Sequence, residues 1–378
     1  MRVLVLASLF PHAHNETLGL STYRRTAPMA AWCDLKVVAL RTRRDLPERE
    51  TFGGLDVIRP RWWRVPKLSV LLDGYVYGAL AGRALRRACP DFVPDLIDAH
   101  WLYPDGFGAV RLARRLGKPL VLSGRGSDVN ELCFRWPTRG FARQALRGAT
   151  HLIAVSSALK EKMIEAGGPA DRITVVTNGV DTALYCPGDR DAARQALGVA
   201  SGPLVLLSAG SVVESKGFQH LIAGLRLLPA DLRVHLYVAG PGPYREALER
   251  IARERGVADR VTFLGRVAQE RMPLWYRAAD FFCFGSLREG CPNVVLESLA
   301  CGTPVVSTRV GGVPDLVEEG RTGLLFEPGW PEAFARALKQ AAARTWDRSA
   351  IAARGASRSW QQTARECFAV FERVLEHR

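Results

Sequence analysis

The stretch of sequence that decides the fold runs from Ser286 to Val317 and reads SLREGCPNVVLESLACGTPVVSTRVGGVPDLV. Two carboxylates, Glu289 and Glu297, lie eight positions apart, around the start of an apolar helical run. The first N–H groups of a helix have no partner within the helix, and a preceding Gly-x-Pro turn leaves them open to a phosphate. The stretch therefore predicts an anion-binding helix start with two carboxylates beside it.

Short apolar runs typical of buried parallel strands recur along the whole chain. The first half contains RVLVLAS, LKVVALR, LIDAH, PLVLSG and HLIAVS, and the second half contains LVLLSAG, VHLYVAG, VTFLG, FFCFGS, TPVVST and GLLFEP. Amphipathic helical stretches lie between them, and strands that alternate with helices predict doubly wound α/β sheets. Two series of strands in 378 residues predict two such domains.

The boundaries of these domains follow from a break in the pattern. Around residues 182–200 the sequence changes to Asn-Gly, Pro-Gly and charged residues, which are typical of a domain junction. We expect an N-terminal domain over residues 1–185 and a second domain over 186–358. The last amphipathic segment, 359–378, is expected to form a C-terminal helix.

Ligands in open α/β sheets bind at the carboxyl ends of the strands, and the unusual residues of the second half follow its strands. They are Gly210-Ser211, Gly240-Pro241-Gly242 and Gly285-Ser286. Lys216 lies just before Gly217, in a strand-to-helix turn. At that place a lysine is either a phosphate ligand or a solvated turn residue.

The charge of the chain is strongly positive and uneven. The net charge is +14, and residues 1–186 hold 27 Lys and Arg against 17 Asp and Glu. Such an imbalance predicts an anionic partner for the first half, whereas a coding bias would also explain why 45 of the 52 basic residues are arginine. The eight cysteines are scattered without zinc-site spacing and are interpreted as reduced thiols.

Membrane insertion and secretion are not indicated. No run of about 18 apolar residues occurs, so no transmembrane helix is predicted. The N-terminal MRVLVLASLF is interpreted as a first strand rather than a signal segment. We therefore expect a cytoplasmic protein.

Taken together, Glu289-Gly290-x-Pro292 with Glu297, followed by CGTPVV and GGVPDLV, resembles the retaining glycosyltransferases of family 4. Further segments follow in family order and extend the resemblance over nearly the whole chain: LFPHAHNETLG, DLIDAHWLYPDGFGA, AVSSALKEKM, TVVTNGVD, GSVVESKGF, VTFLGRV and YRAADFFCFGSLREG. The resemblance implies the α/β GT-B architecture, with two facing Rossmann-like domains and a last helix that crosses back to the first.

The resemblance also implies roles in the second domain. Its ligand would be a nucleoside-diphosphate sugar of the UDP or GDP type, with no further cofactor and no metal. Glu297 would accept hydrogen bonds from the ribose hydroxyls, and Glu289 would lie beside the transferred sugar. The donor-binding set would comprise Gly210, Lys216, Gly217, Gly240, Gly242, Val267, Gly290, Pro292, Asn293, Val294 and Glu297. The alternatives are an exposed helix carboxylate for Glu297 and a loop charge paired with Arg288 for Glu289.

The first domain would bind the acceptor, and its candidates depart from the family pattern. His100 closes the strand DLIDAH, and His100 and Asp128 join Glu289 as catalytic candidates, although a structural histidine is an equal alternative. Arg125 stands where many relatives have histidine, and Ser211 where many have a phosphate-binding arginine. Together with Gly19, these two are candidate donor or acceptor contacts. Arg125 would supply charge to the donor, meet an acidic sugar, or bond Asp128 structurally.

The acceptor implied by the resemblance is a saccharide, often attached to a polyprenyl lipid, in the synthesis of cell-surface polysaccharide or another glycoconjugate. The segment RPRWWRVPKL over 59–68 mixes cationic residues with Trp62 and Trp63, and the stripe Arg139, Arg143 and Arg147 adds charge. Such mixtures favour attachment to the inner face of an anionic membrane. Burial of the tryptophans and a solvated charged face are the alternatives.

Two other classes of protein fit the sequence less well. A dinucleotide-dependent oxidoreductase would need G-x-G-x-x-G after the first strand, and GPGPYR lacks the last glycine and lies in the second half. A nucleic-acid-binding protein would need a recognised binding motif, and the positive charge here is diffuse. We expect no nucleic-acid partner.

Overall fold

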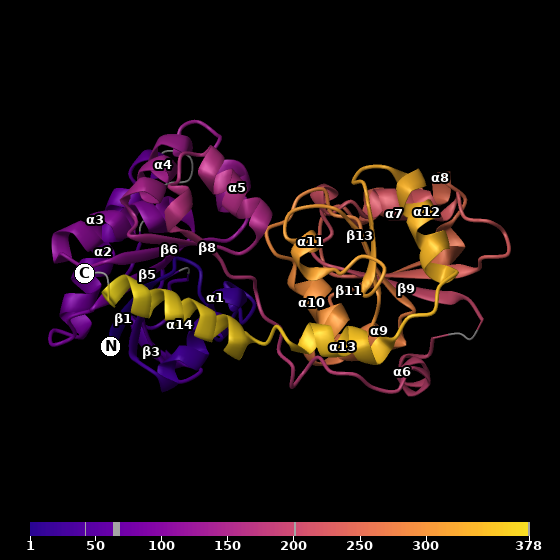
Figure 1. The fold of residues 1–378 in the computed structure, drawn as a ribbon, viewed down its shortest axis with the longest axis horizontal. Helices are drawn as coiled ribbons and strands as arrows, with labels where there is room; N and C mark the ends of the chain where they lie inside the picture. Colours follow the sequence, from indigo (N-terminus) through magenta and orange to yellow (C-terminus); the bar gives the residue numbers. More distant parts are fainter. Residues whose placement is uncertain (42, 63–68, 200–201, 377–378) are drawn as a thin grey trace. The chain divides into compact units, whose positions relative to one another are not determined.

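The computed structural model describes residues 1–378 except 42, 63–68, 200–201 and 377–378 (Figure 1). The chain forms two compact units. Unit 1 comprises Met1–Asn178 and Trp360–Arg378, and unit 2 comprises Gly179–Ser359. Each unit contains a largely or wholly parallel sheet covered by helices on both faces, so the predicted fold class is confirmed. The units meet at residues 178/179 and 359/360, against the expected 185/186 and 358/359.

Unit 1 contains an eight-stranded sheet in the order β3-β4-β2-β1-β5-β6-β7-β8. Its pairs are parallel except for the antiparallel hairpin β3/β4 at one edge. Strands β2 to β4 lie on one side of β1, and β5 to β8 lie on the other, so the strand order reverses between β1 and β5. The strands are β1 (Arg2–Leu6), β2 (Asp34–Val38), β3 (Arg49–Phe52), β4 (Leu55–Ile58), β5 (Leu96–His100), β6 (Leu120–Gly124), β7 (His151–Ala154) and β8 (Ile173–Val175).

The helices of unit 1 cover both faces of this sheet, which explains why its central strands are apolar throughout. Helices α1 and α14 pack on one face, and α2, α3 and α4 pack together on the other. The helices are α1 (Leu20–Thr26), α2 (Asp73–Ala88), α3 (Phe107–Leu116), α4 (Thr138–Gly148), α5 (Ser157–Glu165) and α14 (Trp360–Glu376).

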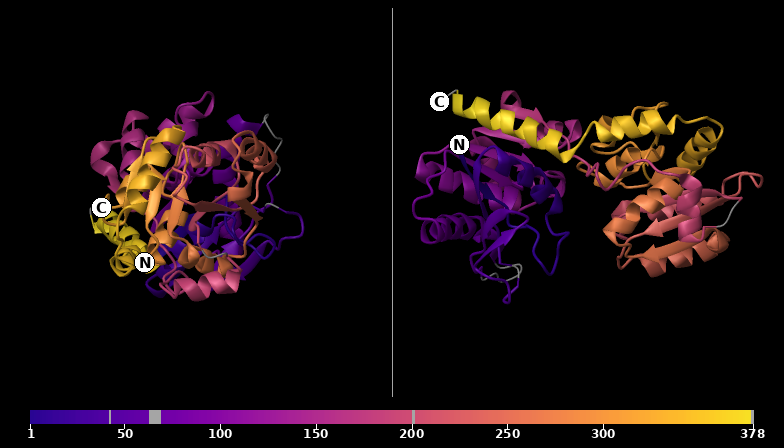
Figure 2. Two further views of the ribbon diagram at one scale, coloured as in Figure 1. Left: turned by 90° about the vertical axis from the view of Figure 1, so that its right-hand side faces the viewer. Right: turned by 90° about the horizontal axis from the view of Figure 1, so that it is seen from below.

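The C-terminal helix α14 belongs to unit 1 although the whole of unit 2 precedes it in the chain. Ala364, Cys367, Val370 and Phe371 recur on one helical face and are buried against the sheet. Figure 2 shows α14, in yellow, beside the N-terminal part of the chain. This helix therefore completes the core of unit 1.

Unit 2 contains a six-stranded, wholly parallel sheet in the order β11-β10-β9-β12-β13-β14. The order reverses between β9 and β12, which is where ligands bind in doubly wound sheets. The strands are β9 (Leu204–Ala209), β10 (Val234–Ala239), β11 (Val261–Gly265), β12 (Phe281–Phe284), β13 (Val305–Thr308) and β14 (Gly323–Phe326).

The helices of unit 2 again form two layers. Helices α7, α8 and α12 share a core with one face of the sheet, and α9, α10 and α13 lie on the other face (Figure 1). The helices are α6 (Arg190–Leu197), α7 (Phe218–Leu225), α8 (Arg245–Glu254), α9 (Met272–Ala278), α10 (Asn293–Ala300), α11 (Val313–Leu316), α12 (Pro331–Ala342) and α13 (Arg348–Ala356). None of the helices in the described part of the chain has the length and apolar character needed to cross a bilayer.

A buried carboxyl group in unit 1 makes stability depend on pH. Asp105 is fully buried between β5 and α3, and its Oδ2 accepts a 2.6 Å hydrogen bond from the Ser8 N–H. Burial raises the pKa of Asp105 from 3.8 to about 8. Between these values the folded state binds the proton and the unfolded state does not, so the free energy of unfolding falls as pH rises.

We expect Asp105→Asn to weaken this dependence, because the amide keeps an acceptor for Ser8 and cannot ionise. Between about pH 6.5 and pH 8, the midpoint of thermal unfolding should fall more for the wild-type protein than for the variant. Thermal scans at constant ionic strength measure both slopes. Equal slopes would show that Asp105 is ionised in the folded protein.

Candidate active site

Three loops of unit 2 meet at the carboxyl edge of the sheet because glycines allow their backbones to touch. A Cβ atom at Gly217 would lie 1.8 Å from the Gly285 carbonyl oxygen, and one at Gly240 would lie 1.8 Å from that of Gly210. A Cβ at Gly242 would lie 2.1 Å from the Val212 oxygen. Only glycine fits these positions, so the loops after β9, β10 and β12 converge at the switch point.

Lys216 and Glu289 form an ion pair at this edge. The distance between Lys216 Nζ and Glu289 Oε1 is 2.6 Å, and the side chains are 28% and 10% exposed. The backbone N–H of Leu287 donates to the Ser215 carbonyl at 2.9 Å, which fixes the two loops together. A lysine has three donors, so Lys216 can hold a phosphate oxygen while it remains paired with Glu289.

The start of α10 lies directly after Glu289. Pro292 precedes the helix without a side-chain capping bond, and Asn293 and Val294 form its first turn. The N–H of Gly312 donates to the Gly290 carbonyl at 2.8 Å, so the glycine-rich turn after β13 supports this loop. The positive end of the helix dipole and the Lys216 ammonium both favour an anion at this edge.

Glu297 is held by a residue that sequence reasoning missed. Its Oε2 accepts a 2.9 Å hydrogen bond from the hydroxyl of Tyr276, a fully buried residue of α9. Glu297 itself is half-buried, and the Tyr276 hydroxyl orients its carboxylate from the core side. Tyr276 belongs to the segment YRAADFFCFGSLREG, but only the packing of α9 against α10 gives it this role.

The remaining donor candidates of unit 2 lie on the same edge of the sheet. Gly210 directly follows β9 with φ +149°, and no atom outside its chain neighbours lies within 4 Å of the place where its Cβ would be. Ser211 is exposed beside it, and Val267 is half-buried in the loop after β11. The structure therefore brings Lys216 and Glu289 into contact, with α10 beginning shortly after Glu289, and places Gly210, Ser211 and Val267 in loops along the same edge.

In unit 1, His100 lies in a buried polar cluster at the end of β5. Arg25 of α1 is paired with Asp98 and donates a 2.8 Å bond to Ser123 Oγ. Arg25 Nη2 lies 2.8 Å from His100 Nε2, and Arg125 Nη2 lies 2.8 Å from His100 Nδ1. Burial and the charge of Arg25 lower the pKa of His100 to about 3, so the ring is neutral.

Both ring nitrogens of His100 face guanidinium groups, which only donate hydrogen bonds. The neutral ring has one acceptor nitrogen and one N–H group, and Asp98 Oδ2 lies 3.3 Å from Nε2. Although burial alone would raise the pKa of Asp98, the charge of Arg25 holds it well below its usual range. In this structure His100 is buried and orients Arg125.

Asp128 and Gly19 shape the loops around this cluster. The buried carboxylate of Asp128 accepts bonds from the backbone N–H groups of Leu102, Arg125 and Gly126, at 3.1, 3.0 and 2.7 Å. Gly19 precedes α1 with φ +64°, and a Cβ there would lie 2.2 Å from the Leu9 carbonyl oxygen. Asp128 thus orders the loop after β6, and Gly19 allows close packing of the loop after β1.

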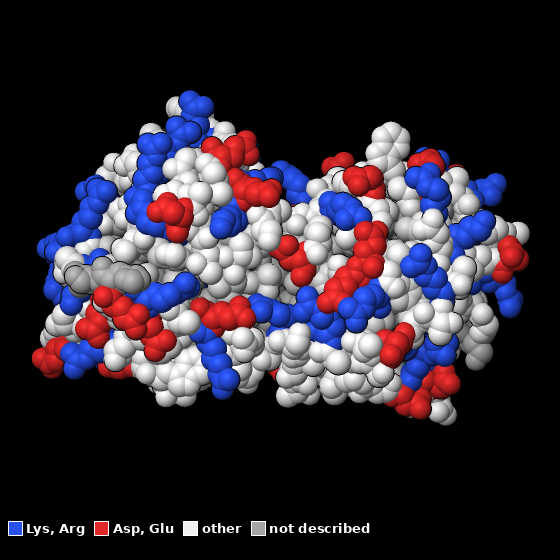
Figure 3. All heavy atoms as spheres, in the orientation of Figure 1, with Lys and Arg blue, Asp and Glu red and all other residues white. Residues whose placement is uncertain are grey.

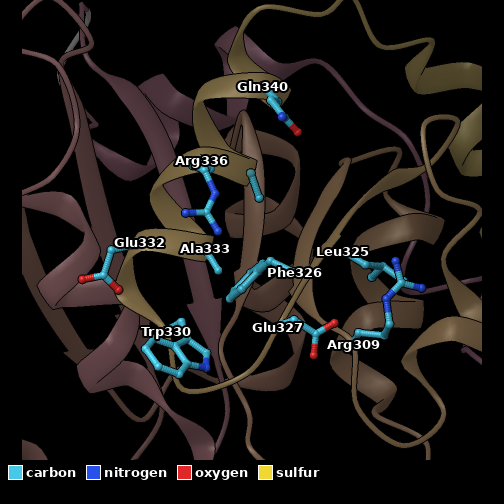
Figure 4. A pocket seen from close by; sticks show the side chains of 10 residues that line it. Arg309, Leu325, Phe326, Glu327, Trp330, Glu332, Ala333, Arg336 and Gln340 are labelled. Atoms are coloured by element: carbon cyan, nitrogen blue, oxygen red, sulfur yellow. The ribbon is translucent and has the colours of Figure 1, made fainter.

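A separate hollow of about 610 Å³ lies between β14 and α12 in unit 2. Figure 4 shows Trp330 at one end, with Glu332, Arg336 and Gln340 along the helix. None of the donor candidates lines it. Within the described part of the chain, no group of three or more His, Cys, Asp or Glu side chains is arranged to hold a metal ion.

Two features bear on the class of protein: a doubly wound sheet in each unit, and a loop edge of unit 2 that carries Lys216, Glu289 and Glu297 around the start of α10. Residues 29–184 match the family model described as Glycosyltransferase Family 4, and residues 203–344 match the model for Glycosyl transferases group 1. The chain belongs to glycosyltransferase family 4, and it is a glycosyltransferase that uses a nucleotide-sugar donor.

Curated relatives support this assignment. A D-inositol 3-phosphate glycosyltransferase of Pseudarthrobacter chlorophenolicus is 33% identical over 298 residues, which is 74% of this chain and 71% of that protein. Its namesake from Geodermatophilus obscurus is 37% identical over 245 residues, which is 62% of this chain and 54% of that protein. The chain thus matches between about half and 71% of the length of these two relatives.

Solved structures confirm the GT-B fold. Sucrose-phosphate synthase from Thermosynechococcus elongatus has a TM-score of 0.82 at 20% identity, covering 100% of both chains. Anabaena HepE, solved in complex with UDP and glucose, has a TM-score of 0.74 at 24% identity, covering 98% of this chain and 99% of that one.

We expect Tyr276→Phe to weaken the binding of UDP by about two- to tenfold, because the lost bond acts on UDP only indirectly, through the orientation of the Glu297 carboxylate. The variant keeps the buried ring but no longer orients Glu297. Calorimetric titration with UDP measures the loss, and a thermal scan checks that the fold is intact. An unchanged affinity in a folded variant would mean that Tyr276 only packs.

Proposed function

We propose that the protein transfers a hexosyl or N-acetylhexosaminyl group, with retention of anomeric configuration, from a UDP sugar to a saccharide acceptor. The acceptor is attached to a lipid, and the product enters cell-surface polysaccharide or another glycoconjugate. The observation that carries the proposal is the Lys216–Glu289 pair beside the start of α10. The UDP bound in the HepE structure supports uridine over guanosine as the base.

The geometry of unit 2 suits the chemistry of this transfer. The bond between the anomeric carbon and the diphosphate oxygen breaks, and its electron pair leaves with the diphosphate. Lys216 and the start of α10 stabilise that negative charge. The acceptor oxygen bonds to the anomeric carbon, and its proton passes to the departing phosphate oxygen. Glu289 orients the sugar and stabilises positive charge at the anomeric carbon, while Glu297 binds the ribose hydroxyls.

Three substitutions separate these roles. Glu297→Ala should weaken UDP binding, and Lys216→Ala should weaken binding of UDP more than of uridine, because only UDP carries the diphosphate. Glu289→Gln should lower kcat more than it changes the Kd of the donor. Loss of a charge-assisted bond corresponds to a factor of about ten or more.

Calorimetry with UDP and uridine, together with measured release of UDP, tests these expectations. Glu270→Gln removes an exposed carboxylate of unit 2 outside the site and serves as the control. If all three site variants bind and turn over like this control, the donor site lies elsewhere.

We also propose that transfer needs no divalent metal, because Lys216 and the start of α10 already supply positive charge to the leaving diphosphate. Transfer by the purified protein should therefore persist, within about twofold, in excess EDTA. Activity that is lost in EDTA and returns with Mg²⁺ or Mn²⁺ would contradict this.

A second candidate acceptor is a phosphorylated polyol. The curated relatives are named for D-inositol 3-phosphate, and unit 1 offers the charge that such an acceptor requires. On the face shown in Figure 3, Lys and Arg side chains gather over α3 and α4. Product analysis with D-inositol 3-phosphate and with lipid-linked saccharides as competing acceptors decides between the two.

We propose peripheral attachment to an anionic membrane through unit 1. The segment predicted for this role extends into residues 63–68, which lie outside the described part, and Trp62 packs inward with its ring 6.1 Å from that of Tyr77. Another surface fits better. Leu72 before α2 and Trp136 before α4 are 60% and 81% exposed. The exposed residues Arg135 and Arg139 flank Trp136 and add charge.

The stripe of arginines on α4 has a partly structural role. Arg143 Nε donates to the Ala166 carbonyl at 3.1 Å, and Arg147 Nε donates to the Gly167 carbonyl at 3.3 Å. These two residues therefore fix α4 to the end of α5, where basic side chains stabilise the last carbonyls of a helix.

We expect the protein to sediment with phosphatidylglycerol vesicles at low salt and to be released at high salt, because screening weakens charge attraction. Replacing both Leu72 and Trp136 by serine should remove most of this binding, because their apolar area no longer enters the interface. Trp330→Ser changes an equally prominent tryptophan of unit 2, 64% exposed, and serves as the control. Equal sedimentation of both variants would exclude this surface.

A further inference from the structure

Arg125 is a partly buried guanidinium group that has no carboxylate partner. It follows β6, at the carboxyl edge of the sheet of unit 1, where ligands bind in this class of fold. Its side chain contacts His100 Nδ1, Asn178 Oδ1 and Thr22 Oγ1. All three of these partners are buried. Among the described residues, no Asp or Glu forms an ion pair with Arg125.

The carboxylates of Asp98 and Asp128 act on Arg125 but make their hydrogen bonds with groups other than its guanidinium. Asp98 is already paired with Arg25, and His100 is neutral. The Asp128 carboxylate is occupied by three backbone N–H groups. Burial and the nearby charge of Arg25 lower the pKa of Arg125 to about 10, which still leaves it charged at neutral pH. Arg125 therefore has no directly paired carboxylate, and the charges of Asp98 and Asp128 act on it only from nearby.

The contacts of Arg125 leave donors available. Nη1 lies 3.3 Å from Asn178 Oδ1, and Nη2 lies 3.5 Å from Thr22 Oγ1, both longer than the usual 2.7 to about 3.2 Å. The 2.8 Å contact with His100 fixes the plane of the group. The N–H groups of Nη1 and the second N–H group of Nη2 are thus weakly engaged. A guanidinium held in one plane with such N–H groups suits an oxoanion, which it binds through two parallel N–H···O bonds.

We infer that Arg125 binds an oxoanion of the substrate, and that Arg25, Asp98 and His100 are positioning residues that hold it in place. The inference rests on the proposed function, because it specifies the chemical class of substrate. Two sources supply this chemistry: the carboxylate of an acidic donor sugar, or a phosphate group on the acceptor. Either group would pair directly with the Arg125 guanidinium.

Paired probes distinguish these sources. UDP-glucuronic acid and UDP-glucose differ in one carboxylate, and sn-glycerol 3-phosphate and glycerol differ in one phosphate. Calorimetric Kd values for all four are measured with the wild-type protein, Arg125→Gln and Arg125→Lys. Arg172→Gln is the matched control, because Arg172 is also half-buried in unit 1 and its side chain donates to a backbone carbonyl.

We expect the wild-type protein to prefer the anionic member of at least one pair. Arg125→Gln should reduce that preference by about tenfold or more. Arg125→Lys should keep more of this preference than Arg125→Gln, because lysine retains the positive charge but lacks the two parallel N–H donors of the guanidinium. A change confined to the first pair assigns the anion to the donor sugar, and a change confined to the second assigns it to the acceptor.

The inference is overturned if the wild-type protein prefers neither anionic probe, or if Arg125→Gln matches Arg172→Gln for both pairs. Binding of UDP to unit 2 is measured in the same preparations. Intact UDP binding with no effect at Arg125 rejects this inference alone, whereas absent UDP binding rejects the proposed function. The sn-glycerol 3-phosphate pair tests Arg125 in either case.

Discussion

The close approach of backbones at the carboxyl edge of β9, β10 and β12 is the constraint on which the proposed donor site depends. Gly217 lies against Gly285, and Gly240 lies against Gly210, at distances that exclude any Cβ. This contact brings the turn that carries Lys216 beside the loop that carries Glu289. The ion pair, the start of α10 and the placement of Glu297 all follow from it.

In both units, buried side chains hold a polar group in one orientation at the carboxyl edge of the sheet. In unit 2, Tyr276 orients Glu297 from within the core. In unit 1, Arg25, Asp98 and His100 orient Arg125. Such groups need little reorganisation when a charged substrate arrives, which is how preorganised polar sites stabilise charge. The two units differ in how the cation is paired: Lys216 forms an ion pair with Glu289, whereas Arg125 has no directly paired carboxylate.

The sequence was sufficient to predict features that depend on local pattern. The alternation of apolar runs with amphipathic helices gave two parallel sheets, and the Glu289-to-Glu297 spacing gave the loop and helix of the donor site. It was not sufficient for features that depend on packing between distant segments. Arg25 meets Asp98 and Ser123 across the sheet, and Tyr276 meets Glu297 between two helices. No periodicity or spacing encodes these contacts.

Hydrogen–deuterium exchange of the full-length protein, with and without saturating UDP, tests the central claim that the edge between β9 and β12 binds the nucleoside diphosphate. The account predicts slower exchange in peptides that cover residues 210–217 and 289–297, because the loops and the start of α10 close on the phosphates. Unchanged exchange in both segments, while calorimetry shows that UDP is bound, would contradict the account.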